Sequence, residues 1–225
     1  MLSGSGTRTR VKICGITRVE DGVAAARAGA DAIGLVFWPG TPRCVNFEQA
    51  GGIVAALPAF VTVVGLFVDP QPDAVRAALA AVPLDLLQFH GSELPEFCAS
   101  FARPYIKAVP VKPGGDLLQY ANRFSSARAL LFDAFQPGGM PGGTGATFDW
   151  NVLPQPLTDA SSRRLILSGG LTPGNVAAAI RHLHPWGVDV SSGVEVTGDD
   201  GRPRKGIKSQ AKIFAFVREV RSADA

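Results

Sequence analysis

Short apolar runs alternate along the chain with segments whose apolar residues recur at helical spacing. Each run is apolar on both parities near its start, which is typical of a strand covered on both faces. The intervening segments place apolar residues at i, i+3, i+4 and i+7, as in a helix with one buried face. The expected strands are 11–16, 32–37, 61–68, 86–90, 105–111, 129–134, 164–170 and 188–194, and the expected helices are 19–28, 47–57, 73–81, 94–101, 175–183 and 210–220.

Eight strands that alternate with helices predict an α/β fold, the (β/α)8 or TIM barrel, as a single domain over residues 11–221. An open doubly wound sheet has the same alternation and is the alternative. The count of eight and the position of the glycines favour the barrel. Residues 1–10 are polar and predict a flexible N-terminal extension, and the Gly- and Pro-rich stretch 136–150 predicts a long loop, followed by a short helix near 148–153.

Charge and composition narrow the classes of function. The formal net charge is only +3 and no dense basic run is present, so nucleic-acid binding is not expected, whereas a small anionic ligand is. The three cysteines include no CxxC pair, which argues against a disulfide framework and favours a reducing, cytoplasmic location. No apolar run reaches the roughly 18 residues of a membrane span. The first ten residues lack the apolar centre of a secretory signal.

Polar residues at the ends of the expected strands mark the candidate site. Barrel enzymes carry their active sites at the C-terminal ends of the strands. The residues expected there are Cys14, Arg43 in the loop after the second strand, Asp69, His90, Lys107, Asp133, Ser168, Gly169, Gly170, Asp189, Ser191, Ser192 and Gly193.

Glycine and serine at the ends of the seventh and eighth strands predict a phosphate site. Bare backbone amides bind anions, and barrels commonly place a phosphate in these two loops. Thr172 is expected to cap the following helix, with Pro173 at its first position. The alternative is that the glycines only end the strands.

Cys14 and Asp133 are candidates for proton transfer. A buried cysteine is usually a small hydrophobe, and it becomes a base only as a thiolate, which needs a nearby cation such as Lys12. Burial of a carboxyl group at the end of an apolar strand favours its neutral form, which can donate a proton near neutrality. The alternative for Asp133 is a structural carboxylate that caps a loop or pairs with Lys107 or Lys12.

Three further side chains allow a functional and a structural interpretation. The planar fork of Arg43 suits a carboxylate or phosphate, unless it is a solvated loop charge. His90 either orients the substrate or only ends its strand. Lys107 is either a Schiff-base nucleophile or a member of a structural ion pair. No His, Cys or acidic residues show metal-ligand spacing, so no metal is expected.

An ordered set of motifs resembles the phosphoribosylanthranilate isomerase family, a barrel enzyme of tryptophan biosynthesis. The resemblance runs from about residue 11 to residue 220, and any one motif alone would be unspecific. The motifs are KICGIT (12–17), GLVFWPGTPRCV (34–45), VGLFVD (64–69), LLQFHGSE (86–93), LLFDAF (130–135), GGTGATFDW (142–150), LSGGLTPGNV (167–176), VDVSSGVE (188–195) and GRPRKGIK (201–208).

The resemblance implies an Amadori rearrangement. N-(5-phosphoribosyl)anthranilate becomes 1-(2-carboxyphenylamino)-1-deoxyribulose 5-phosphate, with no external cofactor because the redox change is internal to the substrate. It implies Cys14 as general base, Asp133 as general acid and Arg43 as the partner of the anthranilate carboxylate. Substrate contacts are expected from His90, Gly169, Gly170, Asp189, Ser191, Ser192 and Gly193.

Two rival functions stay open at this point. One is an aldolase of the same barrel type that uses Lys107 as a Schiff base, and the other is a phosphate-ligand binder without catalytic activity. A small-molecule phosphosugar is the expected partner, and a monomer is the expected state. Residues 142–145 are expected to form a mobile cover, and residues 198–206 are expected to lie outside the site.

Overall fold

The computed structural model of the protein describes residues 8–111, 117–134, 150, 153 and 165–225, with the side chains of 117 and 118 left aside. Eight parallel strands close into a barrel in chain order, which confirms the predicted fold. The strands are β1 (Arg10–Cys14), β2 (Ala32–Val36), β3 (Thr62–Phe67), β4 (Leu86–Phe89), β5 (Tyr105–Val111), β6 (Ala129–Ala134), β7 (Leu165–Leu167) and β8 (Gly187–Val190).

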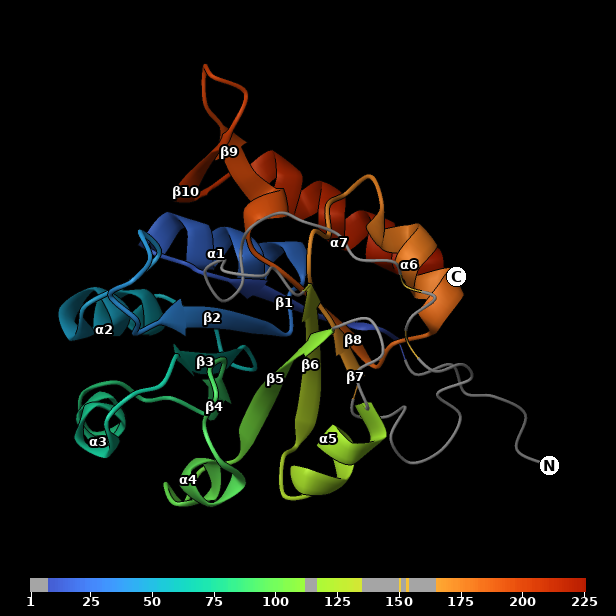
Figure 1. Cartoon of the computed structure of the whole chain (residues 1–225). Helices are drawn as coiled ribbons and strands as arrows, with labels where there is room; N and C mark the ends of the chain where they lie inside the picture. Colours follow the sequence, from blue (N-terminus) through green and yellow to red (C-terminus); the bar gives the residue numbers. More distant parts are fainter. Residues whose placement is uncertain (1–7, 112–116, 135–149, 151–152, 154–164) are drawn as a thin grey trace.

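Helices surround the strands on the outside of the barrel (Figure 1). They are α1 (Val19–Ala28), α2 (Phe47–Ala55), α3 (Pro72–Ala81), α4 (Pro95–Ala99), α5 (Leu117–Arg123), α6 (Val176–Leu183) and α7 (Gln210–Asp224). Helix α5 was missed in the sequence because its apolar pattern is short. None of the described helices is long and apolar enough to cross a lipid bilayer.

Side chains alternate between the inside of the barrel and the layer beneath the helices, as the period of two in a strand requires. On β5, Ile106 and Ala108 join a small apolar cluster with Leu131 and Ile166 inside the barrel. The residues of the other parity, such as Val109, belong to the large core between barrel and helices. Burial of one such apolar side chain stabilises the folded protein by about 1.5–3 kcal/mol. This alternation therefore decides which polar side chains reach the interior.

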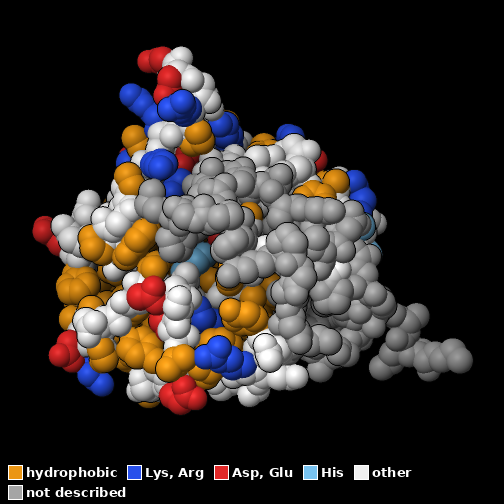
Figure 2. All heavy atoms as spheres, in the orientation of Figure 1, with side chains coloured by type: hydrophobic (Ala, Val, Ile, Leu, Met, Phe, Trp, Pro, Cys, Tyr) orange, Lys and Arg blue, Asp and Glu red, His pale blue; other side chains and the backbone are white. Residues whose placement is uncertain are grey.

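A two-stranded hairpin follows β8 and was not expected. It consists of β9 (Glu195–Thr197) and β10 (Pro203–Lys208), which pair antiparallel. Figure 1 shows the hairpin projecting beyond α1 and α7, and Figure 2 shows charged side chains gathered on its tip. The tip residues 199–205 are exposed, whereas Glu195 and Lys208 at its base are buried.

The N-terminal boundary of the barrel lies earlier than predicted. Residues 1–7 of the expected extension lie outside the described residues, but Thr9 and Arg10 belong to the fold. The amide and hydroxyl of Thr9 both donate to the carboxylate of Asp224 at the end of α7. The Arg8 guanidinium pairs with Asp31, which also accepts the amide of Val11. These contacts join the start of β1 to the end of the last helix.

Candidate active site

Cys14 is the last residue of β1 and its buried side chain lies in a cluster at the C-terminal end of the barrel. Lys12, two residues earlier, shares its face of the strand. A Cβ at Gly34 on β2 would lie 2.8 Å from the Cys14 Sγ and 3.1 Å from the Lys12 Nζ. The absent side chain at Gly34 therefore allows the thiol and the ammonium to approach each other.

The charges around Cys14 act in opposite directions. Burial raises the pKa of the Cys14 thiol, Asp189 raises it further, and the cations of Lys12 and Lys208 oppose this shift. Burial also acts to lower the pKa of Lys12, but Asp189 and Cys14 outweigh it and the net shift is upward. Lys12 is therefore a cation at neutral pH. A thiolate formed at Cys14 has the positive charge of Lys12 nearby, on the same face of β1.

Asp133 points into the barrel from β6 and is 7% exposed. Its Oδ2 lies 3.1 Å from the Nε2 of His90, and its Oδ1 accepts the amide of Ala134 at 2.9 Å. Gly169 has a φ of +87°, and a Cβ there would lie 3.1 Å from the Asp133 Oδ1. The predicted alternative of a pair with Lys107 or Lys12 is wrong, since both lysines have other partners.

Lys107 faces away from the barrel interior, on the opposite parity of β5 from Ile106. Its Nζ donates to the carbonyls of Phe89 and Gly91 and to the Glu93 carboxylate at 3.0 Å. An ammonium that is buried, paired and turned toward the helices does not meet a substrate inside the barrel. The Schiff-base interpretation of Lys107 is therefore wrong, and its structural alternative is correct.

Arg43 is buried, so its interpretation as a solvated loop charge is wrong. Its Nε and Nη2 donate to the two carboxylate oxygens of Glu195 at 2.7 and 2.9 Å. A Cβ at Gly15, which has a φ of +71°, would lie 2.7 Å from the Arg43 Cδ. The arginine therefore lies directly against the residue that follows Cys14.

Glu195 at the base of the hairpin, itself bound by Lys208, holds Arg43 in place. This contact was not predicted from the sequence. Burial would raise the pKa of Glu195, but Arg43 and Lys208 outweigh it and the pKa is lowered. Lys208 donates to Glu195 at 3.2 Å and to the carbonyl of Ser191 at 3.0 Å. The segment 198–206 was expected to lie outside the site, yet the Gly206 amide also donates to Glu195. No motif signalled this, because the partners are 152 residues apart in the chain.

The loops after β7 and β8 meet, as the predicted phosphate site requires. A Cβ at Gly193 would lie 1.9 Å from the carbonyl oxygen of Leu171, so only glycine fits there. Ser192 begins a single 3-10 turn, Ser192–Val194. The first amides of such a turn have no acceptor within it. The two loops therefore bring backbone donors together at the C-terminal end of the barrel.

Helix α6 begins later than predicted. Its N-cap is Asn175, and Thr172 instead closes the preceding turn by accepting the Gly174 amide at 3.2 Å. The side chain of Asn175 bridges this turn, since its Oδ1 accepts the Thr172 amide and its Nδ2 donates to the Gly170 carbonyl. The predicted N-cap was therefore three residues too early, whereas the predicted start of the helix at residue 175 was one residue early.

Asp189 was expected to contact the substrate, but its carboxylate contacts two side chains of the protein instead. Its Oδ1 accepts the Lys12 Nζ at 2.7 Å, and its Oδ2 lies 3.4 Å from the Ser168 hydroxyl. Lys12 and Asp189 are register partners where β1 and β8 close the barrel. Both carboxylate oxygens are therefore engaged with the protein, and we leave Asp189 out of the substrate contacts proposed below.

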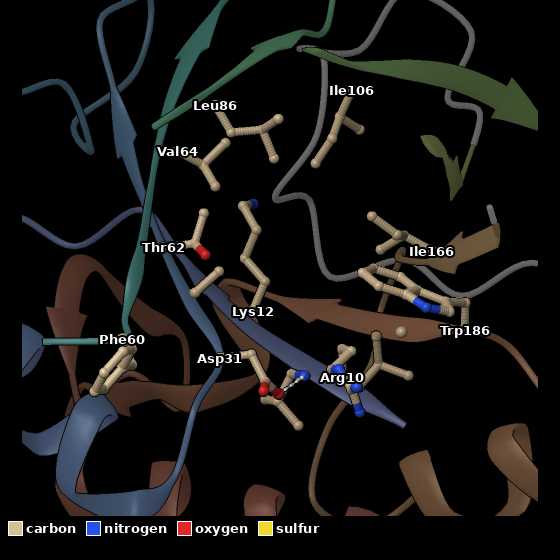
Figure 3. A pocket seen from close by; sticks show the side chains of 14 residues that line it. Arg10, Lys12, Asp31, Phe60, Thr62, Val64, Leu86, Ile106, Ile166 and Trp186 are labelled. Atoms are coloured by element: carbon tan, nitrogen blue, oxygen red, sulfur yellow. Dashed lines mark hydrogen bonds between the residues drawn. The ribbon is translucent and has the colours of Figure 1, made fainter. Parts of the chain in front are cut away.

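A cavity of about 280 Å³ lies at the other end of the barrel. Arg10, Ala32, Thr62 and Leu86, the first residues of four strands, line it. Figure 3 shows Lys12 extending from its strand into the space among the apolar side chains of this cavity. The cavity lies toward the N-terminal ends of the strands, whereas Cys14 and Asp133 lie at the C-terminal ends, so it is not the candidate active site. The expected cover, residues 142–145, lies outside the described residues.

Comparison with known proteins decides the family. Residues 11–219 match the family model described as N-(5'phosphoribosyl)anthranilate (PRA) isomerase. The chain belongs to this family. Over the residues that the structure describes, no group of three or more His, Cys, Asp or Glu side chains could bind a metal ion.

Relatives of the phosphoribosylanthranilate isomerase family cover nearly the whole chain. An N-(5'-phosphoribosyl)anthranilate isomerase of Nitrosospira multiformis is 54% identical over 94% of this chain and 96% of its own. One of Pseudomonas fluorescens is 53% identical over 95% of this chain and 96% of its own. The crystal structure of the Thermus thermophilus isomerase has a TM-score of 0.81 at 36% identity and covers 95% of this chain and 99% of that one.

A further solved structure of a phosphoribosylanthranilate isomerase contains a ligand. It is a complex with reduced 1-(o-carboxyphenylamino)-1-deoxyribulose 5-phosphate, with a TM-score of 0.78 and 35% identity over 95% of this chain and 99% of that one. The name of that ligand describes a phosphorylated sugar chain joined to an aromatic carboxylate.

Proposed function

We propose that this barrel isomerises N-(5-phosphoribosyl)anthranilate to 1-(2-carboxyphenylamino)-1-deoxyribulose 5-phosphate, a step of tryptophan biosynthesis. Membership of the family supports the reaction. The observation that carries the assignment to residues is the placement of Cys14 and Asp133. Cys14 is the last residue of β1 and Asp133 the last but one of β6. Both face inward, and two strands, β7 and β8, separate β6 from β1 around the ring.

Asp133 is the general acid of the first step. Opening of the furanose ring requires a proton on the ring oxygen, and the carboxyl group of Asp133 donates it. The bond between C1 and the ring oxygen breaks, and the nitrogen lone pair forms a cationic imine. The carboxylate that remains on Asp133 accepts hydrogen bonds from Ala134 and from His90, if the histidine carries its proton on Nε2.

Cys14 is the general base of the second step. The cationic imine acidifies the hydrogen on C2, so a thiolate is a sufficient base. Cys14 takes this proton, an enolamine forms, and its tautomerisation gives the ketone. Lys12 stabilises the thiolate electrostatically, which offsets part of the cost of burial.

The substrate carries anions at its two ends, and the site offers a receptor for each. Arg43, held in place by Glu195, binds the anthranilate carboxylate next to Cys14. The loops that carry Gly169, Gly170, Ser192 and Gly193 bind the phosphate through backbone amides. A positioned acid and base each contribute about 10²–10⁴-fold to rate, so positioning by these two anchors supplies the rest.

The direct test is turnover of freshly prepared phosphoribosylanthranilate, followed by the loss of its fluorescence. We expect turnover by the wild type and a loss of about 10²–10⁴-fold in kcat for Asp133→Asn, with little change in affinity for a phosphate analogue. Asp73→Asn, on the exposed face of α3, is the matched control and should keep wild-type rates. An inactive wild type would contradict the reaction, and an active Asp133→Asn would contradict the role of Asp133.

A further inference from the structure

Gln88 is a buried polar side chain that the proposed reaction does not yet use. It is fully enclosed and lies on the same inward parity of β4 as Leu86. Its amide Nε2 lies 2.9 Å from the Nδ1 of His90. Its Oε1 has no hydrogen-bond partner among the described residues. A buried amide oxygen without a partner calls for an explanation.

The contact with Gln88 decides which nitrogen of His90 carries the proton. With its NH₂ group toward the ring, the amide of Gln88 donates, and the Nδ1 of His90 accepts. A neutral imidazole whose Nδ1 accepts carries its proton on Nε2. The Nε2–H then donates to the Oδ2 of Asp133, 3.1 Å away. In this chain of hydrogen bonds, Gln88 therefore donates to His90, and His90 donates to Asp133.

We propose that Gln88 is a positioning residue that fixes His90 as the Nε2–H tautomer, so that the proton of Asp133 is left for the substrate. This proposal rests on the proposed role of Asp133 as general acid. In this arrangement Asp133 receives a hydrogen bond from His90 and donates its own proton elsewhere. When that proton moves to the ring oxygen of the sugar, the new carboxylate keeps the Nε2–H bond, which strengthens as the charge develops.

The opposite orientation of the amide would stop the reaction. With Oε1 toward His90, the Nδ1 would carry the proton and Nε2 would present a lone pair to Asp133. The carboxyl proton would then be bound between Oδ2 and Nε2 and would not reach the substrate. The unpartnered Oε1 is the consequence of the productive orientation, because turning the amide would satisfy Oε1 and misdirect the proton.

Other charged groups near the chain have partners of their own. Lys107 and Glu93 bind each other on the outer side of the barrel, and Asp69 accepts the amide of Ser92. Among the described residues the hydrogen bonds of the His90 ring are those to Gln88 and Asp133. Because a protonated Asp133 can either donate to the Nε2 of His90 or accept from it, Gln88 is the partner that selects the tautomer.

The tautomer can be observed directly by ¹⁵N NMR of the histidine rings in the full-length protein, with His90 assigned through His90→Asn. We expect the wild type to show a neutral His90 protonated on Nε2. Gln88→Glu presents only acceptor oxygens and should move the proton to Nδ1. A wild-type His90 protonated on Nδ1, or on both nitrogens at neutral pH, overturns the proposal whatever the activity.

The kinetics give a second, independent test. We expect Gln88→Glu to lower kcat by about 10² with KM changed less than about threefold, because the wrong tautomer binds the acidic proton. Gln88→Met, which removes the polar group at similar volume, should lose less. A role in packing alone predicts the reverse order, since glutamate is the closer isostere, and that order overturns the proposal.

One control variant and the two measurements together separate the possible failures. Gln71→Glu makes the same substitution at the exposed N-cap of α3 and should keep wild-type kcat. If the wild type has no isomerase activity, the proposed function fails, while the NMR result still decides the tautomer. If turnover is present and Gln88→Glu keeps both kcat and the Nε2–H tautomer, the inference about Gln88 is wrong and the proposed function stands.

Discussion

Two buried lysine–carboxylate pairs lie on opposite faces of the same sheet and have different roles. Lys12 and Asp189 lie inside the barrel at 2.7 Å, and Lys107 and Glu93 lie outside it at 3.0 Å. All four side chains are almost fully buried. In the linear sequence the two lysines look alike, since each lies within an apolar strand.

The difference between the pairs is what else each lysine contacts. Lys12 is next to the thiol of Cys14, so its charge acts on a group that we place in the reaction. Lys107 binds two carbonyls and Glu93, and so fixes the loop after β4 to the outer side of β5. A buried ion pair is therefore no evidence of catalysis, and the face of the strand decides its role.

The largest expected effect is on the inner face, at Cys14. Cys14→Ala should lower kcat by about 10²–10⁴-fold while the protein stays folded, because it removes the base. Cys98→Ala is the matched control, since Cys98 is buried in α4 on the outer side and burial raises its pKa to about 12. The measurement is the fluorescence assay at saturating substrate together with circular dichroism. Equal activity of both variants would remove Cys14 from the mechanism.

The second largest effect is expected on the outer face, where a change at Glu93 should lower the stability of the protein. Glu93→Ala leaves the Lys107 ammonium buried without its carboxylate, which should lower the free energy of unfolding by about 3–5 kcal/mol. The kcat of the folded protein should change little, because Lys107 does not face the substrate. Urea denaturation measures the first quantity and the turnover assay the second.

Asp189→Ala completes this comparison from the inner side. It should lower both the unfolding free energy and kcat, since it leaves Lys12 unpaired beside Cys14. If Glu93→Ala lowered kcat as strongly as Asp189→Ala does, the division between the two faces would be wrong.

The smallest effect is expected at the half-exposed pair of Arg8 and Asp31. Burial acts to raise the pKa of Asp31, but Arg8 and the Val11 amide outweigh it and the pKa is lowered from 3.8. The ionised form is therefore favoured by folding. Its contribution is present above about pH 4 and is lost as the pH falls through the lowered folded-state pKa.

Solvent screening limits this contribution to about 1 kcal/mol or less. Asp31→Asn should therefore cost that much at pH 7, and the difference from the wild type should shrink in acid. Thermal unfolding at several pH values measures it. The exposed pair of Asp73 and Arg76 is the reference and should show no measurable effect. A constant difference at all pH values would show that the charge of Asp31 is not the cause.

The sequence alone determined the barrel and most of its elements. Both parities of each strand are apolar, which is typical of a sheet covered on both sides, and the count of eight favoured the closed barrel over an open doubly wound sheet. Element ends shifted by up to four residues, as at the end of α7, and at β7 Gly169 and Gly170 were assigned to the strand but lie beyond it. The short α5 and the hairpin of β9 and β10 were missed, because a polar two-stranded ribbon has no buried face to produce a pattern.

The sequence also placed Cys14, Arg43 and Asp133 at the strand ends, since position along a parallel strand follows from the chain. Only the tertiary structure decided their partners. Glu195 beneath Arg43, Asp189 beside Lys12 and Gln88 beside His90 are set by the closure of the ring and the direction of each side chain. Hydrogen bonds are local in space and not in sequence, so no linear pattern contains them.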